Sequence, residues 1–207
     1  MSARHADLNR KAALASIFVA VLLVGMKLWA AISTGSTAML GSLADTALDL
    51  VASVATLIGV WVAAMPDDAN HRFGHGKAEA LAAMFQVVLI SISAIGIAFR
   101  AVGQFLGQAQ VAEAESGVIV STIALGATLA LLAYQRHVIR QTGSLAISTD
   151  NVHYKSDLFL NLAVIAALVL DTWLGITGAD AVFAFGIALW LAWGAWGASQ
   201  EAVDQLM

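Results

Sequence analysis

Two acidic residues, Asp45 and Asp49, lie four positions apart inside the apolar run that extends from Met39 to Ala64. Residues at this spacing share one face of a helix. The run is long enough to cross a bilayer, which takes about 20 residues. Because an ionised carboxylate in a membrane costs at least a few kcal/mol unless a cation compensates it, the pair predicts a cation site.

A second pair with the same spacing, His153 and Asp157, lies in the apolar run over residues 145–172. The two runs are expected to cross the membrane in opposite directions, so both pairs can reach one depth near its middle. One imidazole nitrogen and three carboxylates would then converge, and Zn²⁺ accepts four such ligands tetrahedrally. The chain has no Cys, so thiolate ligands are excluded.

Spacing alone leaves three interpretations open for these pairs: a metal site, which we favour, a pure proton relay, and structural polar packing. Two pairs on different helices are harder to explain by packing than a lone intramembrane Asp. Lys155 lies two residues from both His153 and Asp157, so it points away from their face. We expect Lys155 to extend toward the membrane surface or to pair with Asp150.

The composition predicts the elements that must carry these residues. The chain is 60% hydrophobic and only 12% charged, with a mean hydropathy of +0.82, which is typical of a polytopic membrane protein. No strand-like alternation is present, which favours helices over a barrel. We therefore predict an all-α membrane protein with six transmembrane helices, over residues 12–33, 39–64, 79–105, 116–136, 145–172 and 180–203.

The basic residues predict the orientation of these spans. Loops rich in Lys and Arg mark the cytoplasmic side, and they place both termini inside. The basic residues outside the spans are Arg4, Arg10, Lys11, Arg72, Lys77 and Arg140, with Arg136 at the end of the fourth span. The first apolar run is too long for a cleaved signal peptide. We expect a multi-pass protein of the inner (plasma) membrane, with the lipid bilayer as a partner and no nucleic acid.

Three segments together resemble the cation diffusion facilitator family, most closely its bacterial zinc and iron efflux branch. They read Ala-Asp-Thr-Ala-Leu-Asp over residues 44–49, His-Tyr-Lys-Ser-Asp over 153–157, and Asn-His-Arg-Phe-Gly-His-Gly-Lys-Ala-Glu over 70–79. The resemblance implies a divalent-metal/proton antiporter that works as a homodimer. It implies a transport site with four ligands, Asp45, Asp49, His153 and Asp157. One His among three Asp is similar to the pattern of zinc and cadmium transporters, so Zn²⁺ is the expected cargo, with Cd²⁺ and Fe²⁺ as further candidates.

The resemblance also implies a second metal site in the loop between the second and third spans, formed by Asp68, His71 and His75. Solvent would compete for an ion there, and a charged loop without metal is the alternative. Residues 1–207 are expected to form one cation-efflux transmembrane domain. Family members usually carry a cytoplasmic domain after the sixth span, which this sequence lacks; a natural lack and a truncation are equally open.

The charge of the site suggests how transport would be coupled. An empty site with about three ionised carboxylates could not cross a closed, low-dielectric intermediate. The site would cross only when loaded with metal or protons, so metal would leave the cytoplasm by alternating access. A proton channel and an intramembrane metalloenzyme are the alternatives. An enzyme is disfavoured because a hydrolytic zinc site keeps a ligand position open for water, and no span carries a His-Glu-x-x-His motif.

Overall fold

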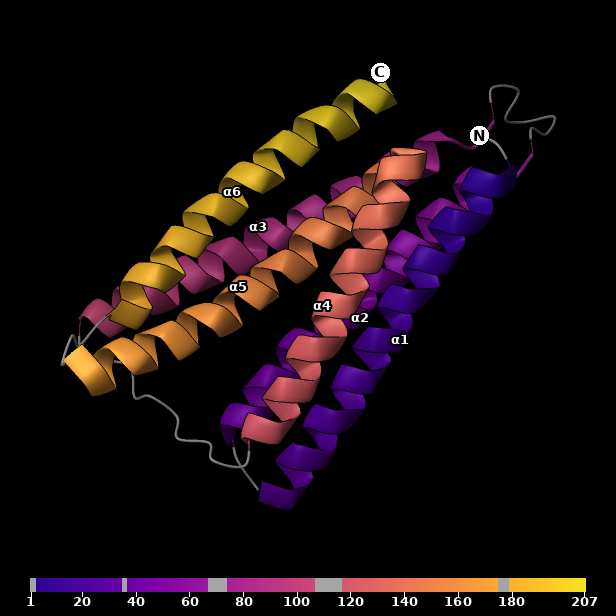
Figure 1. Cartoon of the computed structure of the whole chain (residues 1–207). Helices are drawn as coiled ribbons and strands as arrows, with labels where there is room; N and C mark the ends of the chain where they lie inside the picture. The colour runs from indigo at the N-terminus through magenta and orange to yellow at the C-terminus, as the bar shows by residue number, and fades with distance from the viewer. Residues whose placement is uncertain (1–2, 35–36, 67–73, 107–116, 175–178) are drawn as a thin grey trace.

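The computed structural model describes residues 3–34, 37–66, 74–106, 117–174 and 179–207. It contains six helices, and each expected span corresponds to one of them (Figure 1). Their bounds are α1 Ala3–Thr34, α2 Thr37–Ala63, α3 Lys77–Phe105, α4 Gly117–Thr142, α5 Leu145–Leu174 and α6 Ala179–Leu206. The predicted all-α class is confirmed.

Successive helices run in alternating directions, so the start of α1 and the end of α6 lie at the same end of the bundle (Figure 1). We call this the terminal end. The end of α2, the start of α3, the end of α4 and the start of α5 also lie at the terminal end (Figure 1), and the basic loops were predicted on this side. The arrangement therefore agrees with an even number of crossings.

Four helices of the described part are long and apolar enough to cross a membrane, over residues 4–33, 45–63, 77–103 and 181–206. The first half of helix α5 carries the polar residues of the candidate site. Helix α4 extends past the predicted end at Arg136 to Thr142, where Gly143 adopts a positive φ of 65°. These features are those of a polytopic membrane protein.

Helix α5 contacts each of the other five helices, which encloses its polar face. Helices α3 and α6 pack closely on one side of it, and α1, α2 and α4 gather on the other (Figure 1). Small residues such as Ala94, Ala188 and Ala195 line the contact between α3 and α6. Within a membrane, such residues allow the close helix approach that drives association.

Candidate metal centre

Three of the expected ligands converge where α2 meets α5. Asp49 lies at the middle of α2, and His153 and Asp157 lie one turn apart on α5. One ligand atom from each of the three lies within 4.8 Å of the other two. The Nε2 atom of His153 is 2.7 Å from Oδ1 of Asp49. His153 is buried, and the two carboxylates are half-buried.

The second ring nitrogen of His153 is also informative. When the ring is neutral and Nε2 donates its hydrogen to Asp49, Nδ1 keeps an unshared electron pair. In the described part of the chain Nδ1 is buried and has no hydrogen-bond partner. A buried acceptor without a partner is costly, and a cation would satisfy it. One imidazole and two carboxylates form a donor set suited to a divalent metal.

Asp45 stands apart from this group. It is exposed, and its Oδ2 atom is 3.9 Å from Nη1 of Arg100 on α3. All four expected ligands lie within the described residues. The structure brings ligand atoms of three of them within 4.8 Å of one another and leaves Asp45 beside the Arg100 side chain. The spacing of the sequence did not predict this pairing, although a basic residue near the end of an antiparallel span opposite an acid was a usable signal.

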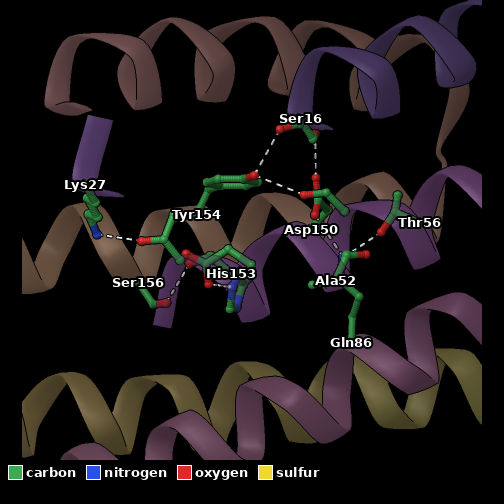
Figure 2. Close-up of polar contacts among 12 residues, drawn as sticks. Ser16, Lys27, Ala52, Thr56, Gln86, Asp150, His153, Tyr154 and Ser156 are labelled. Carbon is green, nitrogen blue, oxygen red and sulfur yellow. Dashed lines mark hydrogen bonds and ion pairs between the residues drawn. The ribbon is translucent and has the colours of Figure 1, made fainter. Parts of the chain in front are cut away.

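A second cation lies near the same part of α2. Lys27 of α1 donates a hydrogen bond of 2.6 Å to Oγ1 of Thr46 (Figure 2). Thr46 is buried and directly follows Asp45. Two basic side chains from different helices therefore approach the start of the acidic segment, where they offset its negative charge.

A neutral contact fixes α2 against α5 one turn from the acidic group. The Tyr154 hydroxyl is 3.0 Å from Oγ of Ser53 and donates to the backbone oxygen of Ser16 at 3.2 Å (Figure 2). Ser53 follows Asp49 by four residues, and Tyr154 directly follows His153. The contact therefore sets the register in which His153 meets Asp49.

Two further expectations have different outcomes. The predicted loop site remains a prediction, since Asp68 and His71 lie outside the described residues and His75 lies just before α3. The suggested pair between Lys155 and Asp150 is not formed, because Asp150 accepts its hydrogen bonds from Ser16, Gln86 and Gln135. Five residues of helix separate Asp150 from Lys155, which turns the two side chains about 140° apart.

Comparisons with known proteins identify the family of the chain. The family model for the cation efflux transmembrane domain matches residues 13–207. The cation-efflux pump FieF of Pectobacterium atrosepticum is 40% identical over 207 residues, which are 100% of this chain and 69% of that protein. The cation-efflux pump FieF of Cronobacter sakazakii is 38% identical over the same shares of the two chains.

The fold, the apolar helices and these matches point to one class of protein. The chain is a multi-pass inner-membrane protein, as the sequence predicts. It belongs to the cation diffusion facilitator family, of the FieF type, whose members are metal cation efflux transporters.

Proposed function

We propose that the chain is a divalent-metal/proton antiporter that exports Zn²⁺ from the cytoplasm by alternating access. The observation that carries the proposal is the convergence of Asp49, His153 and Asp157 in the interior of the bundle. The buried Nδ1 atom of His153 supports it, since this atom needs a cation or a donor.

The electrostatics of the three groups favour exchange over leak. With Asp45 included, the empty site carries about three negative charges when its carboxylates are ionised. Crossing in that state is disfavoured because burying unpaired charge costs several kcal/mol per ion. Loading with either one divalent cation or protons removes most of the charge. The site therefore carries metal one way and protons the other.

Asp45 completes the proposed four-ligand site when it leaves Arg100. A rotation of its side chain toward Asp49, one turn away on the same helix, would close the coordination of Zn²⁺. Cd²⁺ and Fe²⁺ are further cargoes of the same donor set. With four ligands engaged no position remains for a hydrolytic water, so the site transports and does not catalyse. The transporter is proposed to work as a homodimer.

The test is proton flux driven by a zinc gradient across proteoliposomes that contain the chain. We expect Zn²⁺-dependent proton movement in the wild type and its loss in Asp49→Asn. Asp7→Asn is the matched control, since Asp7 is an exposed acid that pairs with Lys11 at the start of α1. An Asp49→Asn variant that keeps the wild-type flux, or a wild type that shows none, would refute the proposal.

A further inference from the structure

Another carboxylate, that of Asp150, is fully buried at the centre of the bundle. It does not belong to the candidate metal centre described above. It lies on α5 one turn before His153, on the side of the terminal end. Its Oδ2 accepts hydrogen bonds from Ser16 Oγ of α1 and Gln135 Nε2 of α4, each at 2.7 Å. Its Oδ1 accepts from Gln86 Nε2 of α3 at 2.9 Å (Figure 2).

The hydrogen bonds continue from these partners to the neighbouring elements. Gln86 Nε2 also lies 2.5 Å from Thr56 Oγ1 and 3.3 Å from the Ala52 oxygen, and these two acceptors of α2 share its second hydrogen. Asn151 Nδ2 donates to Gln135 Oε1 at 3.0 Å. The hydrogen bonds around the Asp150 carboxyl group therefore connect residues of five helices, α1 to α5.

Every donor to Asp150 in the described part of the chain is neutral. The faces of α1, α2, α3 and α4 that reach it contribute hydroxyls, amides and a backbone oxygen. Its ionisable neighbours are His153 and Tyr154 on α5, with Asp49 of α2 beyond them, bonded to His153. An ionised carboxylate buried in a membrane bundle without a cation at hand is costly.

The hydroxyl of Ser16 can serve either charge state of Asp150. Its oxygen lies within hydrogen-bond distance of two acceptors, Asp150 Oδ2 at 2.7 Å and the Ala12 oxygen at 3.2 Å. A hydroxyl has a single hydrogen. When Asp150 is ionised, Ser16 donates to it. When Asp150 carries a proton on Oδ2, that proton is donated to Ser16 Oγ, and the Ser16 hydrogen turns to Ala12.

We propose that Asp150 is a proton-binding site of the transport cycle, separate from the metal ligands. It holds a proton when the metal centre is empty and releases that proton to water when a divalent cation occupies Asp49, His153 and Asp157. The inference rests on the proposed antiport function and assigns one of its protons to a specific carboxyl group.

The position of Asp150 suits this exchange. A divalent cation one helical turn away stabilises the ionised carboxylate through the low-dielectric interior. Asp150 lies between the metal centre and the terminal end, which the basic loops place at the cytoplasm. A proton released there as metal loads from the same side moves opposite to the metal. In the described conformation Asp150 is sealed, so the exchange takes place in another conformation of the cycle.

The experiment measures how many protons move per Zn²⁺ in proteoliposomes, for wild type and Asp150→Asn. The substitution is nearly isosteric. Its amide nitrogen can face Gln86 if the Gln86 amide turns over, which is open to it because Gln86 Oε1 has no partner among the described residues. We expect the ratio to fall by one proton per ion in Asp150→Asn and to return to the wild-type value in Asp150→Glu.

Thr149→Val is the control for packing. Thr149 is buried, and its hydroxyl donates a hydrogen bond within its own helix, to the Leu145 oxygen. Its ratio should equal that of the wild type. An unchanged ratio in Asp150→Asn, even with slower transport, would overturn the proposal and leave Asp150 as a positioning residue. If the Asn variant does not fold, Asp150→Ser gives the same test with a smaller side chain that does not titrate.

A second readout separates this inference from the proposed function. Protons released on addition of Zn²⁺ to the detergent-solubilised protein can be counted with a pH indicator, without any transport. One proton fewer in Asp150→Asn supports the proton site, and an equal count refutes it. Absence of flux in wild-type proteoliposomes would refute antiport alone.

Discussion

The most informative perturbation compares two acids on the same face of α2. Asp49→Asn and Asp45→Asn remove the same charge at positions four residues apart. The structure places Asp49 at 2.7 Å from His153 and Asp45 at 3.9 Å from Arg100, exposed. If this conformation is the one that loads metal, the two variants should differ strongly in metal affinity.

The geometry sets the size of the difference. Loss of a residue that contacts a metal-ligating His lowers metal affinity by about 10- to 100-fold. Asp49 contacts His153 and is itself an expected ligand, so its loss should weaken Zn²⁺ binding by at least about tenfold. Asp45 must first leave Arg100, and an exposed pair is worth about 0–1 kcal/mol. That release cancels up to about fivefold of the affinity that Asp45 contributes as a fourth ligand, so we expect a smaller loss in Asp45→Asn than in Asp49→Asn.

The assay is isothermal titration of Zn²⁺ into the purified protein in detergent. Thermal unfolding without metal serves as the control that both variants are folded. Equal losses in the two variants would show that Asp45 contributes as much as Asp49 to the loaded site, and that the conformation that binds metal differs from the one described here. A larger loss in Asp45→Asn would refute the three-residue centre itself.

Three further predictions follow from individual contacts. Arg100→Gln should release Asp45 and raise Zn²⁺ affinity by less than about fivefold, measured by the same titration, with the exposed Arg140→Gln as a control that should change nothing. Tyr154→Phe and Ser53→Ala should show a coupling free energy of about 0.6 kcal/mol in a double-mutant cycle of unfolding, and a coupling near zero would mean that their contact does not hold α2 to α5. Gly59→Ala should destabilise the bundle by about 1–3 kcal/mol, because its Cβ would lie 2.3 Å from that of Ala82. In Gly25→Ala the added Cβ meets no described atom within 4 Å, so this substitution should not destabilise the bundle in the same unfolding assay.

Asp150 and its hydrogen-bond partners Ser16, Gln86 and Gln135 form a second polar group in the interior of the bundle. The candidate metal centre and the hydrogen-bonded residues around Asp150 share α5, and they lie one turn apart along it. Each also reaches α2, through Asp49 in the first case and through Gln86 with Thr56 in the second. Movement of α5 against α2 would therefore alter both sites together, which is the coupling that an exchange of metal for protons requires.

The amino-acid sequence by itself determined the helical class, the number of helices and the residues that share a face within one helix. Long apolar runs leave few alternatives in a membrane, because every backbone group must be satisfied within its own segment. The period of 3.6 residues per turn then places His153 and Asp157 together whatever surrounds them. The same period places the two residues of each motif on the second and fifth spans together, and these motifs carried the family resemblance.

Contacts between helices were decided only by the tertiary structure. Sequence spacing gives the direction of a side chain on its own helix, whereas its partner depends on how the helices rotate and slide against one another. Asp45 illustrates this, since it shares a face with Asp49 but lies against Arg100 in the bundle. Asp150 illustrates it again, because Ser16, Gln86 and Gln135 come from three distant segments. Packing at close approaches such as Gly59 against Ala82 sets those rotations, and no local pattern in the chain encodes them.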